Sequence, residues 1–443
     1  MNWRRPLIWS LLRASGSQIP QRYKEILNNV GNPGQLLEIQ RLRLSELIRY
    51  AREHVPYYRA TYTNPDLINE HGMVEMDEFH GLPFLGKAEL RDQFPALQST
   101  EHRNRHTFEN SSGGSTGEPV RFIQDRFYRE ADIAATLFLF KMAGKELGDP
   151  ELKLWGSERD ILEGSIGHRE RLENWLYNRT LVNSFRMDEF RMQSLAAAWN
   201  KSKPLVVWSY VDSIFEFARF VKRENMTLVP PKAIITTAGT LDEHIRSVIE
   251  STFNTSVLNQ YGSREVGVLG CEEPNVTGLR LFEWKHYVEV IDEDGRPCAA
   301  GKEGDIVVTC LENFSMPLIR FKIGDRGVLS NDKPLRRLSS VTGRITDHFV
   351  CRDGTIIHGE YFSHLFYFKD WVKRFQIVQT DYDRVTCFIV LQHDPVASDI
   401  ADIESRIQAV MGRKCEVRFN SVEDIQPSKS GKFLYTRCEV SRN

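Results

Sequence analysis

The chain has 443 residues, of which 41% are hydrophobic and 27% charged, and its formal net charge is −2. This length is enough for two or more domains, and the near-neutral charge argues against a nucleic-acid partner. No apolar run reaches the roughly 18 residues that cross a bilayer. Seven scattered cysteines without a C-x-x-C pair indicate a reduced, cytoplasmic protein rather than a disulfide framework.

The first 13 residues are basic and aromatic, but their apolar part is too short and too interrupted for a signal peptide. We expect a helix that packs on its own domain. A peripheral contact of this N-terminus with an anionic membrane surface is the alternative.

Helical periodicity covers residues 35–63, where apolar side chains recur with arginine and glutamate between them. The sequence His-Val-Pro at 54–56 should end this helix, because the residue before proline is pushed out of the helical conformation. A second helix is expected over 127–142.

Short apolar runs then alternate with helical segments. Strands are expected at 152–155, 205–208, 232–237 and 257–260, and helices at 213–222 and 241–253. Strands that alternate with helices indicate βαβ units and a mainly parallel sheet.

The pattern becomes rich in β-structure after this point. Strands are expected at 287–291 and 304–309, the first followed by the turn sequence Asp-Glu-Asp-Gly at 292–295. Beyond residue 347 a compact α+β segment follows, with a strand at 386–391 and a helix at 400–411.

The predicted fold class is therefore α/β. A large N-terminal domain (1–347) would hold a mainly parallel βαβ sheet and a β-rich subdomain. A small C-terminal α+β domain (348–443) would act as a mobile lid.

A stretch rich in glycine and hydroxyl side chains spans residues 110–119, Asn-Ser-Ser-Gly-Gly-Ser-Thr-Gly-Glu-Pro. Glycine lacks the Cβ atom that blocks close approach, so such a loop can surround phosphate oxygens with N–H groups and hydroxyls. No Gly-Lys-Ser/Thr follows at the required spacing, so it is not a Walker loop. Taken alone, the stretch is also compatible with an ordinary surface turn.

Four later segments carry further signals. They are Asn-Gln-Tyr-Gly-Ser-Arg-Glu at 259–265, a run ending in Gly-Asp at 317–325, Gly-Arg-Ile-Thr-Asp at 343–347, and Pro-Ser-Lys-Ser-Gly-Lys-Phe at 427–433. Each one alone has a structural explanation as a turn or loop. The order of all five segments on a scaffold of strands and helices favours a functional site.

Together these segments resemble the adenylate-forming enzyme superfamily, and most closely its phenylacetate–CoA ligase branch, which includes CapK-like proteins linked to capsular polysaccharide biosynthesis. The resemblance runs almost from end to end and includes residues 49–59 and 82–87. Its motifs are specific to the superfamily and say little about the substrate.

The resemblance implies a site for ATP and magnesium. The residues implied in nucleotide binding are Ser112, Gly113, Gly114, Ser115, Thr116, Gly117, Ala238, Gly239, Thr240, Tyr261, Gly262, Ser263, Arg264, Asp325 and Arg344. In the family pattern the glycine-rich stretch wraps the β- and γ-phosphates, and residues 238–240 pass beside the adenine. Tyr261 would stack on adenine, Asp325 would accept from the ribose hydroxyls, and Glu265 would hold magnesium.

Catalytic roles implied by the resemblance fall on Lys432, Glu265 and Arg344. Lys432 would bridge the α-phosphate and the substrate carboxylate, and Arg344 would reach the ribose or the phosphates. Fixed cations suit this chemistry, because negative charge builds on the phosphorus as the carboxylate attacks. Asp347 would be the hinge of a lid that withdraws the lysine before the second half-reaction.

Two positions depart from the family pattern. Glu118 stands where the phosphate loop often has lysine, and we expect it to face solvent. Arg264 stands where threonine or serine is usual. An inward arginine could bind a phosphate or the acid's carboxylate with two hydrogen bonds, and an outward one would pack away from the site; we favour the inward orientation.

A pocket for the acyl group is expected at Trp155, Gly156, Ser209 and Tyr210, because these residues end strand-like runs at the edge where open α/β sheets bind ligands. Core packing of the aromatic rings is an equal alternative. A zinc site at Cys271, with Glu272, Glu273 and His286, is a weaker hypothesis, because only one cysteine lies there.

The expected function is therefore an ATP-dependent, AMP-forming ligase that makes an acyl-adenylate, releases pyrophosphate and passes the acyl group to a thiol, by default CoA. The alternatives are transfer to an amine, such as an amino sugar, and a degenerate nucleotide-binding scaffold. The expected partners are a small carboxylic acid, its acceptor and a second copy of the chain in a homodimer.

Overall fold

The computed structural model describes residues 2–113, 119–156, 168–239, 241–330, 336–342, 348–366, 369–425 and 434–440. The helices are α1 (Arg4–Ala14), α2 (Ile19–Asn29), α3 (Pro33–His54), α4 (Pro56–Thr61), α5 (Met76–His80), α6 (Lys87–Asp92), α7 (Phe94–Leu97), α8 (Arg126–Met142), α10 (His168–Leu176), α11 (Glu189–Ser202), α12 (Val211–Arg223), α13 (Glu243–Phe253), α14 (Gly359–His364) and α15 (Ala397–Met411). Short 3₁₀ helices cover Pro65–Leu67 and His102–Asn104.

The strands run through the rest of the chain. They are β1 (Thr107–Gly113), β2 (Pro119–Asp125), β3 (Glu151–Trp155), β4 (Arg179–Asn183), β5 (Arg186–Met187), β6 (Val206–Tyr210), β7 (Ala233–Thr237), β8 (Ser256–Ser263), β9 (Gly267–Glu273), β10 (Val276–Leu281), β11 (His286–Ile291), β12 (Glu303–Cys310), β13 (Phe321–Leu329), β14 (Arg337–Thr342), β15 (His348–Val350), β16 (Ile356–His358), β17 (Val372–Asp381), β18 (Arg384–Leu391), β19 (Glu416–Ser421) and β20 (Thr436–Cys438).

The helical segment expected over 35–63 forms as two helices, α3 and α4. The side chain of Asn32 caps α3 by accepting a hydrogen bond from the Gln35 amide, and Pro33 suits the first turn. Val55 lies between the two helices in an extended conformation (φ −115°, ψ 112°). Pro56 imposes this break, because a residue before proline avoids the helical region.

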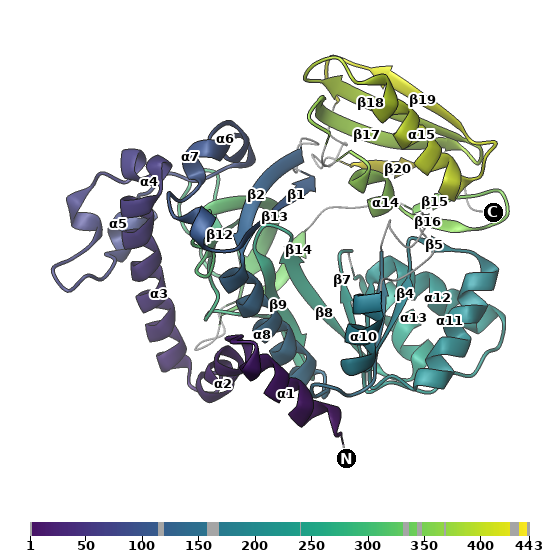
Figure 1. Cartoon of the computed structure of the whole chain (residues 1–443), viewed down its shortest axis with the longest axis horizontal. Coiled ribbons are helices and arrows are strands. Elements are labelled where there is room, and N and C mark those ends of the chain that lie inside the picture. Colours follow the sequence, from purple (N-terminus) through teal and green to yellow (C-terminus); the bar gives the residue numbers. More distant parts are fainter. Residues whose placement is uncertain are drawn as a thin grey trace.

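One sheet of eleven strands forms the centre of the molecule, in the order β11-β12-β13-β14-β10-β9-β8-β7-β6-β3-β4 (Figure 1). The strands from β8 to β4 pair in parallel, and those from β11 to β8 pair antiparallel. The parallel and β-rich parts predicted from the sequence are therefore both present, and they share one continuous sheet.

Helices cover both faces of the parallel part. On one face α8 packs against alternate residues of the strands, such as Trp208 and Ile235. On the other face α11, α12 and α13 pack against the residues between them, such as Val207 and Ile234. This two-sided burial explains why these strands appear in the sequence as continuous apolar runs.

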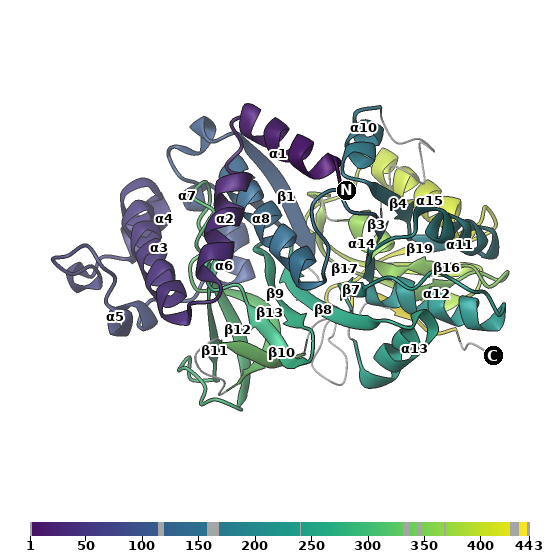
Figure 2. The same ribbon diagram turned by 90° about the horizontal axis from the view of Figure 1, so that it is seen from below.

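The C-terminal part forms a separate four-stranded sheet, β19-β18-β17-β20, which α15 covers through Ile403, Ile407 and Val410. It lies beside the edge of the large sheet where the parallel strands end (Figures 1 and 2). A second small sheet, β15-β16-β5, joins the two parts, because β5 comes from the N-terminal part. The large and small units of the predicted fold class are thus both observed, and the boundary at residue 347 stays a prediction.

The N-terminal helix α1 packs on its own chain through Ile8, which is buried, and Trp9, whose ring stacks on Tyr23 at 5.6 Å. Its opposite face exposes Trp3 and Leu7, so contact with a membrane surface stays an untested prediction. No described helix combines the length and the apolar character needed to span a membrane. The seven cysteines all lie in described residues and are free thiols.

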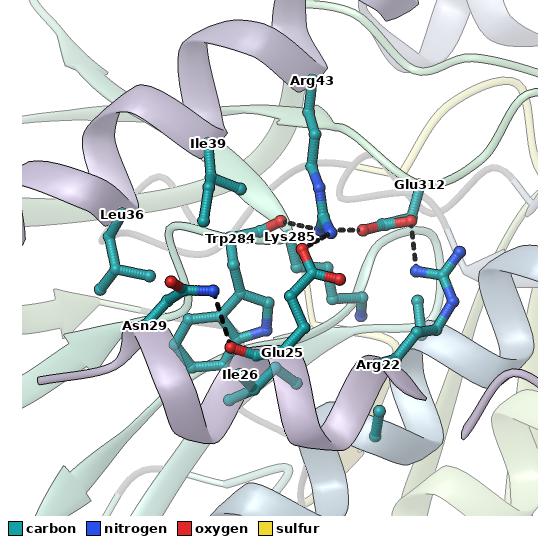
Figure 3. Close-up of a pocket in the computed structure, with 12 residues that line it drawn as sticks. Arg22, Glu25, Ile26, Asn29, Leu36, Ile39, Arg43, Trp284, Lys285 and Glu312 are labelled. Atoms are coloured by element: carbon teal, nitrogen blue, oxygen red, sulfur yellow. Dashed lines mark hydrogen bonds and ion pairs between the residues drawn. The ribbon is translucent and has the colours of Figure 1, made fainter. Parts of the chain in front are cut away.

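A buried cluster of charges fastens the N-terminal helices to the sheet (Figure 3). The Glu312 carboxylate accepts from Arg22 of α2 at 2.8 Å and from Arg43 of α3 at 2.5 Å. Arg43 also pairs with Glu25 at 2.6 Å and donates to the Trp284 carbonyl. Each arginine is therefore compensated, and Glu312 is the shared partner.

Replacing Glu312 with glutamine should destabilise the fold by about 3 kcal/mol, because it leaves the buried Arg22 guanidinium without its carboxylate and Arg43 with only the more exposed Glu25. Urea unfolding followed by tryptophan fluorescence measures the effect. Glu38→Gln, at an exposed position of α3, is the matched control and should change the free energy of unfolding by less than about 0.5 kcal/mol. Equal stability of the two variants would contradict the role of the cluster.

Candidate functional site

The glycine-rich stretch begins inside a β-hairpin. Residues 110–113 belong to β1, which pairs with β2 so that Ser112 lies opposite Val120 and Gly113 opposite Pro119. The stretch is therefore a strand as far as Gly113 and not a loop throughout, because its pairing with β2 extends to that residue. Its remaining candidates, Gly114, Ser115, Thr116 and Gly117, lie with Glu118 outside the described residues.

Glu265 links this hairpin to the end of β8. Its carboxylate oxygen Oε1 accepts a hydrogen bond from the Ser112 hydroxyl at 2.5 Å and lies 3.6 Å from the Lys87 ammonium. All three side chains are buried. The structure thus brings together two motifs that are 153 residues apart, and it adds Lys87, which the sequence analysis mentioned only as the end of a family-like stretch.

Gln124 and Arg264 extend this contact. The Gln124 amide donates to the backbone carbonyls of Arg264 and Glu265 at 3.0 and 3.3 Å, which holds β2 against the end of β8. The Arg264 guanidinium donates to the Ser111 carbonyl at 3.3 Å and to the ring of His364 on α14. Arg264 therefore points toward the C-terminal part, and His364 is a neighbour that no sequence motif indicated.

Tyr261 and Asp325 also meet. The Tyr261 hydroxyl donates to Asp325 Oδ2 at 2.9 Å, although the residues lie on β8 and β13, 64 positions apart. Both side chains are partly exposed. A ring and a carboxylate side by side, each open to solvent, can contact the two halves of a nucleoside.

Small residues bring backbone close to this edge of the sheet. A Cβ atom at Gly239 would lie 2.8 Å from Val211 and 3.6 Å from the Asp212 carboxylate, and one at Gly262 would overlap the Gly267 carbonyl. Ala238, just after β7, has a positive φ of 54°. The segments 238–240 and 259–265 therefore each contain a glycine, Gly239 and Gly262, at a position that has no room for a side chain. Ser263 ends β8, and Thr240 lies outside the described residues.

The candidates for the acyl pocket divide into two groups. The rings of Trp155 and Tyr210 contact each other at 4.6 Å between centroids, and a Cβ atom at Gly156 would overlap the ring of Phe185. Ser209 is fully buried and donates to the neighbouring carbonyl of Tyr210. It lies on the opposite face of β6, because side chains alternate along a strand, and so the structure does not bring it to the rings.

A partly buried lysine lies next to the Trp155 ring. The ammonium of Lys153 on β3 is 4.2 Å from the Trp155 ring and 4.3 Å from the Trp208 ring. Burial, reinforced by the positive charge of Arg179 and opposed by Glu151, lowers the pKa of Lys153 to about 8. The sequence analysis treated this residue as part of a strand and missed it.

The zinc hypothesis at Cys271 finds no support in the described residues. Cys271 packs in the core, where burial raises the pKa of its thiol. Glu272 pairs with Arg246, Glu273 pairs with Arg280 and Arg337, and His286 bonds to the Val266 carbonyl. Each of the four residues therefore has partners of its own, and they do not form a common set of zinc ligands. The other predicted site residues, Arg344, Asp347 and Lys432, lie outside the described residues.

The lowered pKa of Lys153 predicts a pH-dependent cost. Below about pH 8 the lysine is charged in both the folded and the unfolded chain, so the folded state carries the full penalty of burying it. Stability is regained as the pH rises from about 8 toward the ordinary value of 10.5, because the folded lysine loses its proton first. Lys153→Met should therefore stabilise the protein near pH 7, on the order of 3 kcal/mol at most, and the gain should shrink with rising pH.

Denaturant unfolding of wild type and Lys153→Met across this pH range measures the difference. Lys302→Met, at an exposed position, should leave stability unchanged at every pH. A gain that does not depend on pH would mean that the pKa of Lys153 is the same in the folded and the unfolded chain.

Comparisons with known proteins point to the same family as the sequence motifs. A family model described as the CapK C-terminal domain matches residues 349–438. The chain is 24% identical to Protein CapK of Staphylococcus aureus over 432 residues, which covers 93% of this chain and 91% of that protein. It is 26% identical to phenylacetate-coenzyme A ligase of Aromatoleum evansii over 333 residues, 71% of each chain.

Solved structures share the fold. The crystal structure of 2-hydroxyisobutyryl-CoA ligase in complex with 2-HIB-AMP and CoA in the thioesterification state matches with a TM-score of 0.61 and 18% identity, covering 92% of this chain and 91% of that one. A postadenylation state of the same ligase, with 2-HIB-AMP, matches with a TM-score of 0.57. The chain is thus similar to CapK over 93% and to a phenylacetate–CoA ligase over 71% of its length, in agreement with the family that its motifs resemble.

Proposed function

We propose that the protein is an AMP-forming ligase that activates a carboxylic acid as an acyl-adenylate, releases pyrophosphate and transfers the acyl group to CoA. The observation that carries the proposal is the meeting of Ser112, Lys87 and Glu265 at the end of β8, beside the Tyr261–Asp325 pair. Relatives named phenylacetate-coenzyme A ligase and the ligase structures with a bound acyl-AMP support it.

The nucleoside end of the site is assigned to Tyr261 and Asp325. The tyrosine ring stacks on adenine, and the carboxylate accepts from the ribose hydroxyls. The hydrogen bond between them orients the carboxylate before the nucleotide binds, which lowers the entropy lost on binding. Ala238 and Gly239 are proposed to pass beside the base with their backbone, because the position of a Cβ at Gly239 is filled by Val211.

The phosphate end is assigned to the β1–β2 hairpin and Glu265. A buried carboxylate next to a hydroxyl fits a hard cation such as magnesium, which prefers oxygen ligands and binds together with phosphate oxygens. Bound magnesium would neutralise charge on the phosphates. Lys87 lies at the same carboxylate oxygen, 3.6 Å away, and adds a fixed positive charge on the protein side.

The chemical step is assigned to Lys432 and Arg344. The acid's carboxylate attacks the α-phosphorus and pyrophosphate leaves. A lysine ammonium placed between that carboxylate and the α-phosphate stabilises the negative charge that develops on the phosphate. Asp347 is proposed as the hinge that lets residues 348–443 move afterwards, so that the acceptor reaches the adenylate.

The acid is proposed to lie against Trp155, Tyr210 and the backbone of Gly156. Flat aromatic walls favour an apolar or aryl acid, and the nearby Lys153 adds a cation behind the rings. This assignment guides the choice of acids for the exchange screen described next, and the screen identifies the substrate.

An ATP–pyrophosphate exchange screen over aryl, fatty, hydroxy and amino acids tests the activation step. Mass spectrometry of the products with and without CoA, and with an amino sugar in its place, then identifies the acceptor. A CoA thioester supports the proposal, and an amide formed at equal rates with and without CoA would replace it with the amine-transfer alternative. No exchange with any acid, although ATP binds, would favour a nucleotide-binding scaffold.

Asp325→Ala should weaken ATP binding about ten- to a hundredfold, the range expected for charge-assisted hydrogen bonds of roughly 1.5–3 kcal/mol. Tyr261→Phe keeps the ring and removes only the hydroxyl, so a loss of about twofold to tenfold is expected. Calorimetric titration of both single variants and the double variant measures the coupling. Additive losses would show that the hydrogen bond between the two side chains does not contribute to binding.

Lys432→Ala should slow pyrophosphate exchange a thousandfold or more, because it removes one cation from a transition state that gains negative charge. The neighbouring Lys429→Ala is the matched control and should keep the wild-type rate. The thermal midpoint of both variants should match the wild type. Wild-type exchange in Lys432→Ala would reject the assignment of this lysine.

A further inference from the structure

Three potential metal ligands meet where the C-terminal strands contact the large sheet. His348 Nε2 lies 3.7 Å and His358 Nε2 lies 3.9 Å from the same carboxylate oxygen of Asp212. One ligand atom from each of the three residues can be chosen so that all lie within 4.8 Å of one another. None of these residues belongs to the motifs assigned to the nucleotide.

The local structure explains why the three side chains converge. His348 and His358 are directly opposite each other in the antiparallel pair β15–β16, so their side chains project from the same face. Their rings lie 5.2 Å apart. Asp212 is the second residue of α12, which follows β6 without a loop and so starts at the edge of the sheet that faces these histidines.

The surroundings limit the movement of this group. His358 is almost fully buried, its ring lies 4.9 Å from that of Tyr210, and its backbone amide donates to the Phe185 carbonyl at 3.0 Å. Asp212 and His348 are partly exposed. One buried and two accessible ligands allow an ion to enter from solvent.

We propose that Asp212, His348 and His358 bind a zinc ion. Zinc is held by histidine nitrogen and carboxylate oxygen at about 2.0–2.1 Å, so a tetrahedral ion keeps its ligand atoms about 3.4 Å apart. The two nitrogen–oxygen distances of 3.7 and 3.9 Å need to shrink by a few tenths of an ångström, and the two histidine ligand atoms, within 4.8 Å of each other, must also approach. Two imidazoles and one carboxylate suit zinc better than magnesium or calcium, which prefer oxygen ligands only.

The ion would connect the two parts of the molecule. Asp212 belongs to α12 of the large domain, whereas both histidines follow the proposed hinge. Asp212 Oδ2 is also 3.6 Å from the position of a Cβ at Gly239, so the ion lies beside the segment proposed to pass the adenine. Zinc would stabilise the observed placement of β15 and β16 and so oppose a movement of the C-terminal part about the proposed hinge. This effect on the movement rests on the proposed function, whereas the zinc binding does not.

Zinc content of purified protein, stripped with chelator and reloaded, tests the binding by itself. We expect one zinc per wild-type chain and a thermal midpoint that rises with free zinc. His348→Ala and His358→Ala should each weaken binding about a hundredfold or more and abolish the zinc-dependent rise. His71→Ala, at an exposed histidine next to Glu70, is the matched control and should bind as the wild type does.

Cobalt substitution gives a readout that does not need the variants to fold. Cobalt bound by nitrogen and oxygen shows visible bands without the intense near-ultraviolet absorption of thiolate ligation, which separates this site from the cysteines. Absence of stoichiometric zinc in the wild type, a thiolate spectrum, or unchanged binding in both histidine variants would each overturn the proposal. Because these readouts do not involve ATP, a failure here leaves the proposed ligase activity untouched.

Discussion

The pairing of β8 on both sides is the constraint on which the rest of the structure depends. β8 is parallel to β7 and antiparallel to β9, so this one strand joins the βαβ part to the β-rich part. Its carboxyl end carries Tyr261, Gly262, Ser263 and, directly after it, Arg264 and Glu265. Tyr261 meets Asp325 of the β-rich part there, and Glu265 meets Ser112 and Lys87 from segments that precede the large sheet in the chain.

Partners reach this end of β8 from distant segments because the edge of the sheet is a common meeting point. Asp325 arrives on an antiparallel strand, and Ser112 arrives on a separate hairpin that Gln124 holds in place. Ligands bind at this edge in open α/β sheets for the same reason: strand ends expose backbone and polar side chains that the helices leave uncovered. The contact between Ser112 and Glu265 is therefore a property of the topology as much as of the two residues.

Most of the fold could be predicted because its signals are local. Apolar runs located β3, β6, β7 and β8, and Pro56 located the break between α3 and α4. The site was predictable only where a motif carried it: Glu265 belongs to one, whereas Lys87, Lys153 and His364 gain their roles from tertiary contacts that no periodicity reports. Ser209 illustrates a second limit, because alternate residues of a strand face opposite sides and the sequence does not show which side carries the rings of Trp155 and Tyr210.

The contacts of β15 and β16 decide how a C-terminal lid could move. Two register pairs join β16 to β5, and the rings of Phe185 and Tyr210 pack into the C-terminal core. A rotation at residue 347 must break these contacts, whereas a rotation beyond α14 would leave them intact. Each backbone hydrogen bond between β16 and β5 contributes only about 1 kcal/mol, so the buried rings of Phe185 and Tyr210 account for most of the cost of separating the two parts. A ligand that bridges Asp212 to the histidines would oppose such a separation most directly.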